Sequence, residues 1–548
     1  MSLASRPRVV LRQGTIIGKQ MVGTNDQSRT PQTLDYFLGV PYALSTAGEH
    51  RWKQAVLVGA STGEFDAGRL GKRCPAGEED MVDMGEDCLN LNIYRPSSRP
   101  KDKKLPVLVY FHGGSFNFGA GHYRRIDSMV AWSDRPFIGI SFNYRLGAFG
   151  FLSSKLAKKE GALNLGLRDQ SLLLQWVQDN ISAFDGNPND VTIMGSSAGA
   201  HSVGHHVLVN SPDKPLFHKA IIESGGATAR ACLPYDNEMH ETQFNDFLGN
   251  LGLLQTPPKK VFDVLRTIPT SKIKDASEKV FIQYTETLRW PFQPVIDGEG
   301  GMIPIAPITK WKSGTWQPIP ILTGFNTNEG AVFVDPAVAT DKKFTSFFSL
   351  LLPKLSASDI EALGKTYPDP LTDEKSTFKE LRTSDDIGPQ YTRLEQAYGH
   401  FAYVNPVRQT VHYASKSAPV WLYRFEVNSR YEGGADHGDH DDFVTYNEDV
   451  RAESPSIREI SGKMHAYWTS FVTTGDPNAD GGVWEERATW PRFTMGADGK
   501  YGRAAIFGSG NSEIAGGKEK GMAVKIEEDT WRRKECQYWD ERTELFES

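Results

Sequence analysis

The stretch Val191-Thr-Ile-Met-Gly-Ser-Ser-Ala-Gly-Ala200 decides the fold of this chain. β-Branched and apolar residues lead directly into the pentapeptide Gly195–Gly199, and small residues and helix formers follow it to about Val209. A strand, a sharp turn and a helix in this order are what a G-x-S-x-G turn requires. The pattern therefore predicts that Ser197 occupies a strained turn, with its Oγ exposed at a helix N-terminus and a glycine two residues to either side.

Strands and helices alternate on both sides of this turn. Continuous apolar runs predict strands at Leu105–Phe111, Phe137–Phe142 and Lys219–Ser224, and helical spacing of apolar residues predicts a helix over Asp169–Ile181. The other predicted strands are a pair in Arg8–Gln20 that turns at Gly14, then Tyr36–Tyr42, Ile319–Thr323 and Val420–Phe425; the other predicted helices lie near Lys259–Arg266, Ser356–Thr366 and Asp442–Asp449. This order predicts the α/β class, with one large, mostly parallel sheet, helices on both faces and long helical insertions.

Composition narrows the class of protein. Of the 548 residues, 39% are hydrophobic, which is typical of a globular protein. No linker or repeat divides the chain, so we predict a single domain over residues 1–548. The formal net charge of -7 favours neither a nucleic-acid partner nor a membrane partner. No apolar run is long enough to span a membrane, and Met1-Ser-Leu-Ala-Ser-Arg-Pro-Arg8 lacks the apolar core of a signal peptide, which predicts a cytoplasmic location.

The serine needs two partners. A hydroxyl becomes an effective nucleophile when a base takes its proton, and the base needs an acid to orient it. In hydrolases with this turn, the acid and then the histidine follow the serine along the chain, each in a loop after a strand. The loop after the strand ending at Thr323 offers Glu329, and the loop after the strand ending near Phe425 offers His437. Both follow the carboxyl end of a predicted strand, where open α/β sheets place their sites.

Other interpretations of these loops stay open. Glu329 taken alone is compatible with a solvated loop carboxylate. The second loop holds a cluster of groups that could bind a divalent cation, namely Asp436, His437, Asp439, His440, Asp441 and Asp442. A catalytic histidine already accounts for this loop, so we predict neither a metal nor another cofactor. Packing or surface roles are expected for the remaining histidines considered, which are His201, His205, His206, His218 and His412.

A glycine-rich turn supplies the fourth requirement of acyl transfer. Charge that develops on a carbonyl oxygen must meet fixed N–H donors. His112-Gly-Gly-Ser-Phe116 follows the buried strand Leu105–Phe111 and fits the upstream loop that contributes such donors. Taken alone, this segment would be only a tight turn.

These motifs resemble the type-B carboxylesterase family, which also contains cholinesterases and some fungal lipases. The match runs nearly end to end through Phe37–Ala43, Glu86–Asn92, Asn143–Gly147, Asn164–Gln170, Ala220–Gly225, Pro294–Gly298, Gly324–Gly330, Ala435–Gly438 and Phe471–Asn478. The resemblance implies the α/β-hydrolase fold. It also implies the following site: nucleophile Ser197, acid Glu329, base His437, and an oxyanion hole formed by the N–H groups of Gly114, Ser115 and Ala198.

The chain departs from the family pattern at three positions near these residues. The family has Glu before the nucleophile where this chain has Ser196, so a nearby negative charge is expected to be missing. Ser115 replaces the third glycine of the oxyanion turn, and His440 replaces a family Glu. We expect these differences to affect the substrate and the rate more than the type of reaction.

Two further assignments rest on the same resemblance. Cys74 and Cys88 match the first disulfide of the family, although a cytosolic protein ordinarily keeps such a pair reduced. The segment between them is short and has no aromatic residue, which favours a site without a large lid and weak use of choline esters. Leu288 and Trp290 lie in the segment that lines the acyl side of the family's site, whereas Phe292 is expected to pack in the core.

The predicted function is hydrolysis of small to medium apolar carboxylic esters through an acyl-enzyme. The small-molecule ester is the only partner expected, and the sequence specifies no oligomeric state. A lipase, a lactonase or an acyl-transfer enzyme could use the same residues. A non-catalytic interaction protein of cholinesterase type is the alternative class, but such proteins usually lose a catalytic residue.

Overall fold

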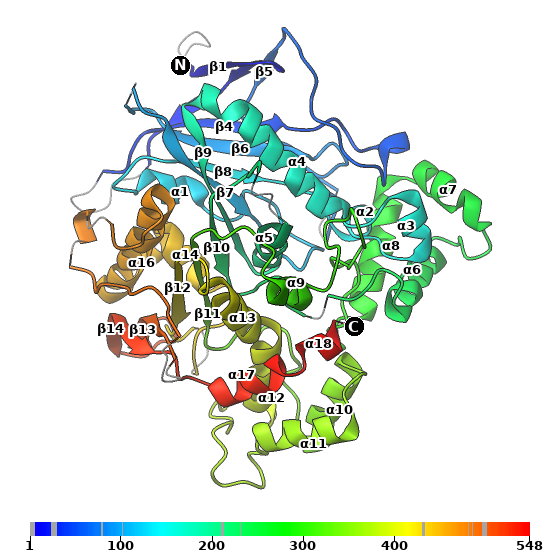
Figure 1. The fold of residues 1–548 in the computed structure, drawn as a ribbon, viewed down its shortest axis with the longest axis vertical. Helices are drawn as coiled ribbons and strands as arrows, with labels where there is room; N and C mark the ends of the chain where they lie inside the picture. The colour runs from blue at the N-terminus through cyan, green and yellow to red at the C-terminus, as the bar shows by residue number, and fades with distance from the viewer. Residues whose placement is uncertain are drawn as a thin grey trace.

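An eleven-stranded sheet runs through the middle of the molecule in the order β14-β13-β12-β11-β10-β9-β7-β8-β6-β4-β3 (Figure 1). The computed structural model describes residues 6–23, 30–77, 81–100, 102–209, 213–230, 232–429, 433–479, 482–484, 486–495 and 501–547. The strands from β8 to β13 in this order are parallel. Antiparallel strands complete both edges. The predicted α/β class with a mostly parallel sheet is therefore confirmed.

The strands match most of the predicted segments. Those of the large sheet are β3 Lys19–Met21, β4 Leu34–Pro41, β6 Asn90–Pro96, β7 Leu105–Phe111, β8 Ile138–Phe142, β9 Gly186–Ser196, β10 Lys219–Glu223, β11 Ile321–Asn326, β12 Val420–Phe425, β13 Arg503–Asn511 and β14 Lys520–Glu528. A second, small sheet contains β1 Arg8–Leu11, β2 Gly14–Ile17 and β5 Glu64–Asp66. β1 and β2 are the strand pair predicted from the sequence.

Helices cover both faces of the large sheet, because alternate side chains of its strands point to opposite sides. Val109 and Ile193 pack into one core with helices α4 Leu165–Asn180, α5 Ala198–Val209 and α13 Asn405–Ala414. Tyr110 and Met194 pack into the other core with helices α1 Ile126–Ala131, α14 His440–Thr445 and α16 Pro455–Thr474. The sheet is therefore buried on both faces, as predicted.

The remaining helices gather at two sides of the sheet (Figure 1). One group comprises α2 Gly147–Gly150, α3 Lys155–Glu160, α6 Glu238–Asn250, α7 Val261–Thr267 and α8 Thr270–Gln283. The other comprises α10 Asp341–Leu351, α11 Ala357–Thr366, α12 Tyr391–Gly399 and α17 Arg533–Asp540, which share a third apolar core with Leu288 and Trp290. Three short helices complete the list: α9 Pro307–Ser313, α15 Glu448–Ala452 and α18 Thr543–Phe546.

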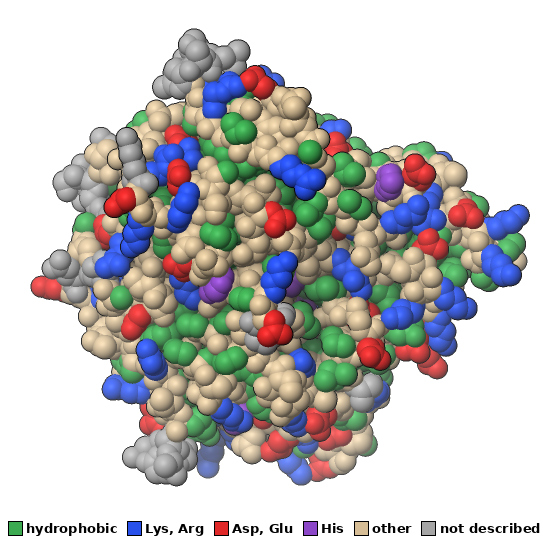
Figure 2. Space-filling view, turned by 45° about the horizontal axis from the view of Figure 1, so that its top comes forward, with side chains coloured by type: hydrophobic (Ala, Val, Ile, Leu, Met, Phe, Trp, Pro, Cys, Tyr) green, Lys and Arg blue, Asp and Glu red, His purple; other side chains and the backbone are tan. Residues whose placement is uncertain are grey.

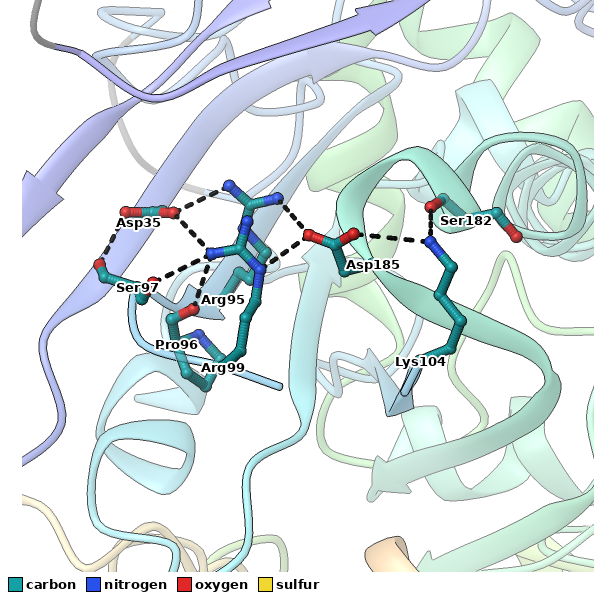
Figure 3. A network of polar contacts seen from close by, with 8 residues as sticks. All are labelled: Asp35, Arg95, Pro96, Ser97, Arg99, Lys104, Ser182 and Asp185. Carbon is teal, nitrogen blue, oxygen red and sulfur yellow. Dashed lines mark hydrogen bonds and ion pairs between the residues drawn. The ribbon is translucent and has the colours of Figure 1, made fainter. Parts of the chain in front are cut away.

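An ion-pair network joins the edge of the sheet to the start of β9 (Figure 3). Arg95 of β6 donates to Asp35 of β4 at 2.8 Å and lies 3.4 Å from Asp185, which immediately precedes β9. Arg99 donates to the same Asp185 carboxylate at 2.7 Å. Because Asp35 and Arg95 are buried, loss of either partner would leave a charge without compensation.

Two predicted helices differ from the structure in detail, and some strands were not predicted. The helix predicted over Asp442–Asp449 is two helices, α14 and α15, because Tyr446 takes a left-handed conformation and Asn447 caps the second helix. The helix predicted to begin at Asp169 begins at Leu165. The strands β5, β6, β13 and β14 were not predicted. The single domain stays a prediction, and residues 1–5 of the N-terminal segment lie outside the described part of the chain.

The surface agrees with the mild net charge. Figure 2 shows Lys and Arg side chains interspersed with Asp and Glu over the face in view. Among the helices of the described ranges, none is both long and apolar enough to cross a membrane.

Candidate active site

Ser197 is the turn between β9 and α5. Its φ of 58° lies in the left-handed region, which few residues other than glycine adopt. A Cβ on Gly199 would lie 2.1 Å from the carbonyl oxygen of Phe111, and a Cβ on Gly195 would lie 2.3 Å from the Gly199 carbonyl carbon. Only glycine fits at these two positions, so the strand, turn and helix predicted around Ser197 are present.

Glu329 and His437 meet in space although 108 residues separate them. His437 Nδ1 lies 2.5 Å from Glu329 Oε2, and the other carboxylate oxygen accepts a hydrogen bond of 2.7 Å from the Asn326 backbone N–H. A carboxylate on Nδ1 favours the tautomer with the proton on that nitrogen. This arrangement leaves His437 Nε2 as the nitrogen that can accept a proton.

The two loops that carry these residues are joined directly. Asn328 donates its backbone N–H to the Ala435 carbonyl at 2.7 Å, and Asn326 Nδ2 donates to the Asp436 carbonyl at 2.6 Å. Asn328 and Asp436 also form an isolated parallel bridge. The loops after β11 and β12 therefore continue the pairing of their strands, which sets the position of Glu329 against His437.

Aromatic rings pack around His437. The ring of Tyr403 lies 4.3 Å from it and that of Phe333 lies 5.1 Å from it, measured between ring centroids. Tyr403 belongs to a π-helical turn, His400–Val404, between α12 and α13. His437 Nε2 is buried and forms no hydrogen bond with Ser197 Oγ or any other described atom. Such bonds are often loose in ligand-free sites and tighten when substrate binds.

The predicted oxyanion turn packs against Ser197. A Cβ on Gly113 would lie 3.1 Å from the Cβ of Ser197. Gly114 and Ser115 have φ values of 101° and 54°, so both occupy the left-handed region. The N–H groups of these two residues donate to no described residue. Ala198 begins α5, where a backbone N–H has no partner within the helix.

A buried carboxylate lies on the strand next to the Ser197 turn, and sequence reasoning missed it. Glu223 of β10 pairs in register with Ser196, the position at which the resemblance led us to expect a missing charge. Arg124 Nη1 lies 2.5 Å from Glu223 Oε2, and Trp468 Nε1 donates to Oε1 at 2.7 Å. Burial opposes ionisation of Glu223, but Arg124 and His440 lower its pKa to about 2. The chain therefore does hold a negative charge beside the turn.

The residues around Glu223 also bear on whether this part of the chain could bind a divalent cation. In the described ranges, the group of side chains with metal-ligand spacing is Glu223, His440 and Asp441, whose ligand atoms lie within 4.8 Å of one another. His437 is not part of it. Arg124 lies 2.5 Å from Glu223 and 3.3 Å from Asp441, so a guanidinium already supplies the positive charge that these carboxylates need. The donor set therefore fits an ion-pair network better than a cation site.

Leu288 and Trp290 are 4% and 5% exposed, and both line a cavity of about 120 Å³. Phe116, next to the predicted oxyanion turn, and His201 of α5 also line it. Gln293 lines the cavity too, and its Nε2 donates to the Ser115 carbonyl at 2.9 Å. The segment predicted for the acyl side thus lies against the oxyanion turn, while Phe292 packs in the core as expected.

Cys74 and Cys88 form a disulfide. The other two cysteines, Cys232 and Cys536, are buried free thiols. Residues 78–80 of the short segment between the bonded cysteines lie outside the described part of the chain. The disulfide pairing implied by the resemblance is present in the structure.

With the fold and site in place, comparison with known proteins decides the family. Residues 5–505 match the Carboxylesterase family. The chain belongs to the type-B carboxylesterase family. Its large sheet and surrounding helices are the α/β-hydrolase fold.

Individual relatives agree with this assignment. Secreted lipase 4 of Gibberella zeae is 34% identical over 537 residues, which cover 96% of this chain and 91% of the lipase. Para-nitrobenzyl esterase of Bacillus subtilis is 30% identical over 473 residues, covering 83% of this chain and 88% of the esterase. The crystal structure of Aspergillus niger EstA has the same fold, with a TM-score of 0.82, 24% identity and 100% coverage of both chains.

Several other residues of the site had no usable signal in the sequence. Arg124 and Tyr403 lie in segments with no predicted role, and nothing in the sequence marks the π-helical turn that places Tyr403 against His437. Glu223 was within reach, because it lies in the Ala220–Gly225 motif quoted for the resemblance. The histidines of α5, which are His201, His205 and His206, are buried as packing residues would be.

Proposed function

We propose that this family member is a serine carboxylesterase without a metal or other cofactor, acting on small to medium esters. Ser197 Oγ attacks the ester carbonyl while His437 Nε2 takes its proton, and the N–H groups of Gly114, Ser115 and Ala198 stabilise the oxyanion. His437 then protonates the departing alcohol. Water attacks the acyl-enzyme by the same steps in reverse and releases the acid.

The hydrogen bond between Glu329 and His437 carries this proposal. A buried carboxylate bound to Nδ1 orients the imidazole and stabilises the imidazolium formed when Ser197 loses its proton. An interaction protein without activity has no use for this geometry, since neither side chain is needed to bury apolar surface. The Ser197 turn and the oxyanion turn packed against it support the same chemistry.

Replacement of Ser197 tests the proposal. Ser197→Ala should lower kcat on 4-nitrophenyl esters by about a million-fold, because removing the nucleophile of a triad removes the unit as a whole. Ser196→Ala is the matched control, since it removes the neighbouring hydroxyl and should retain most of the activity. Mass spectrometry after organophosphate treatment should show label on Ser197. Substantial turnover by folded Ser197→Ala protein would refute the assignment.

The acyl group is proposed to lie against Leu288 and Trp290. The indole closes one side of the cavity, so short acyl chains should react faster than chains of about ten carbons, each methylene in contact being worth about 0.8 kcal/mol. Trp290→Ala should move the optimum of kcat/KM to longer or bulkier acyl groups. A chain-length profile identical to that of the wild type would return Trp290 to a purely structural role.

Lipase activity is the second candidate, because secreted lipase 4 of Gibberella zeae matches most of this chain. The short segment between Cys74 and Cys88 favours an esterase without a large lid. Rates measured across the solubility limit of a triglyceride separate the two: an esterase saturates normally, whereas a sharp rise above the limit would identify a lipase. A lactonase or an acyl-transfer enzyme would reveal itself by its preferred substrate in the same assays.

The cytoplasmic location stays a prediction. The disulfide between Cys74 and Cys88 weighs against it, because such bonds persist mainly in oxidising compartments. Secreted lipase 4 is, by its name, a secreted protein. Immunoblots of cell and culture-medium fractions from the source organism would decide between the two locations.

A further inference from the structure

The charged side chains that line the cavity beside Trp290 are all cationic. Its lining includes three cationic side chains, Arg230, Arg289 and Lys354. Among the described residues that line it, none is Asp or Glu. A cavity that served only an apolar chain would have no need of Arg230 and Arg289, since a charge beside a pocket is costly unless something pairs with it.

Arg230 is held in place at this cavity. Its guanidinium lies 3.8 Å from the centroid of the Trp290 ring, a cation–π contact that fixes the side chain over the indole. Its backbone has a φ of 61°, in the left-handed region. No described carboxylate forms an ion pair with Arg230 or with Arg289, whose Nε instead contacts the Met239 sulfur at 3.3 Å.

Buried N–H donors surround the same space. The Gly226 backbone N–H donates to His201 Nδ1 at 3.3 Å, which places the proton of the neutral ring on Nε2. That nitrogen, His240 Nε2 and Trp290 Nε1 are all buried and have no hydrogen-bond partner in the described part of the chain. Buried indole and imidazole N–H groups usually have a partner, so Trp290 and His201 each present a donor that an acceptor in the cavity would satisfy.

These histidines do not add charge of their own. Burial, with Arg230 close by, holds the pKa of His201 well below its usual value, and burial lowers the pKa of His240 to about 4. Near neutral pH both rings are therefore neutral. The positive charge of the cavity comes from its arginines and lysine.

The cavity lies next to the predicted reaction site, although Ser197, Glu329 and His437 are not among the described residues that line it. Its lining includes Phe116, which follows the oxyanion turn directly, and Gln293, whose Nε2 donates to the Ser115 carbonyl at 2.9 Å. An engineered apolar cavity of roughly 150 Å³ accepts benzene, so a cavity of about 120 Å³ suits a short acyl group. Apolar side chains such as Leu233, Leu352 and Phe401 line the same cavity and suit its methylenes.

We propose that this cavity selects an acyl group that ends in a carboxylate, so that the preferred substrates are monoesters of short dicarboxylic acids. The inference rests on the proposed esterase function and gives its substrate class. The distal carboxylate binds Arg230 and accepts hydrogen bonds from the unpartnered N–H groups, since a carboxylate is an acceptor only. The bonds made and broken are those of ordinary ester hydrolysis, and the products are an alcohol and a dicarboxylic acid.

Matched esters test this selection. Three 4-nitrophenyl esters are compared. They share one six-carbon acyl chain and carry a carboxylate, a primary amide or a methyl group at its far end. The wild type should show a kcat/KM for the carboxylate-terminated ester at least about tenfold above that for the methyl-terminated ester, as charge-assisted hydrogen bonds allow. The amide, isosteric but uncharged, should fall between them. Addition of salt should reduce the carboxylate-to-methyl ratio, because Arg230 is partly exposed.

Arg230→Gln should reduce that ratio about tenfold, because it removes the charge and leaves a shorter, neutral polar side chain. The ratio is measured on one protein sample, so partial misfolding does not change it. Arg12→Gln is the matched control, since it removes an exposed arginine elsewhere and should leave the ratio as in the wild type. If Arg230→Gln does not fold, the wild-type ratio and its salt dependence decide instead.

The outcomes separate the two proposals. The substrate inference alone is overturned if the wild type hydrolyses the methyl-terminated ester as fast as the carboxylate-terminated ester. It is also overturned if Arg230→Gln leaves the ratio of the two kcat/KM values unchanged. A wild type that hydrolyses none of the three esters, and takes up no organophosphate at Ser197, overturns the esterase function and the inference with it.

Discussion

Glu223 remains ionised although it is fully buried, because Arg124 and His440 lower the pKa of its carboxyl group. Glu223→Gln should therefore lower the free energy of unfolding by about 3–5 kcal/mol, since it leaves the Arg124 guanidinium buried with a weakened partner. Chemical denaturation at neutral pH measures this loss. Glu361→Gln, which removes an exposed carboxylate beside Lys365, is the control and should leave stability unchanged.

The pH dependence of this contribution has a definite sign. The pKa of Glu223 falls from 4.5 to about 2 on folding, so the folded state binds its proton less tightly than the unfolded chain. The contribution is complete above about pH 4.5 and is lost as the pH falls toward 2. The stability difference between wild type and Glu223→Gln should shrink over that window. A difference that stays constant down to pH 2 would contradict the assignment.

At the scale of elements, the close packing of helix α5 against the end of strand β7 determines whether the site can form. A methyl group on Gly199 would lie 2.1 Å from the Phe111 carbonyl oxygen, at the end of β7. Gly199→Ala should cost about 1–3 kcal/mol or more as the helix and strand move apart. It should also lower kcat, because the oxyanion turn follows Phe111 directly. Thermal unfolding and ester hydrolysis, measured on the same sample, check both effects.

Gly59→Ala is the control for that substitution. A Cβ on Gly59 would meet no atom within 4 Å, and its φ is not in the left-handed region. This variant should retain the stability and the activity of the wild type. Equal losses in the two variants would mean that the close approach at Gly199 is not responsible.

At the scale of the whole molecule, the disulfide between Cys74 and Cys88 constrains the unfolded chain. Closing a loop of this length is worth about 3 kcal/mol. Reductant should therefore lower the unfolding temperature of the wild type. The double variant Cys74→Ala/Cys88→Ala should start from the lower temperature and no longer respond to reductant. Cys232→Ala, which removes a buried free thiol, should keep the response to reductant.

The architecture of this protein could largely be predicted from local sequence pattern. Apolar runs predicted the central strands, and β12 coincides with its predicted range Val420–Phe425. A parallel strand covered on both faces reads as a nearly continuous apolar run, so its pattern is visible without tertiary information. The antiparallel strand β6 is buried but includes Asn90, Asn92 and Arg95, and it was not predicted. The edge strand β14 was not predicted, because its exposed and partly buried residues follow no such run. Tyr446 split a predicted helix through a backbone conformation that side-chain periodicity does not encode.

Some features of the site could likewise be predicted from the sequence, and others could not. The order of Ser197, Glu329 and His437, each after a strand, follows from the chain because parallel strands bring their carboxyl ends to one edge of the sheet. Only the tertiary structure could place Glu223 beside Ser196, Tyr403 against His437 and Arg230 over Trp290. Each of these contacts joins segments whose spacing in the chain carries no period, and the packing of helices on the sheet decides them. The sequence by itself therefore determined the reaction class that we propose, whereas the charge around the nucleophile and in the acyl cavity was decided by the fold.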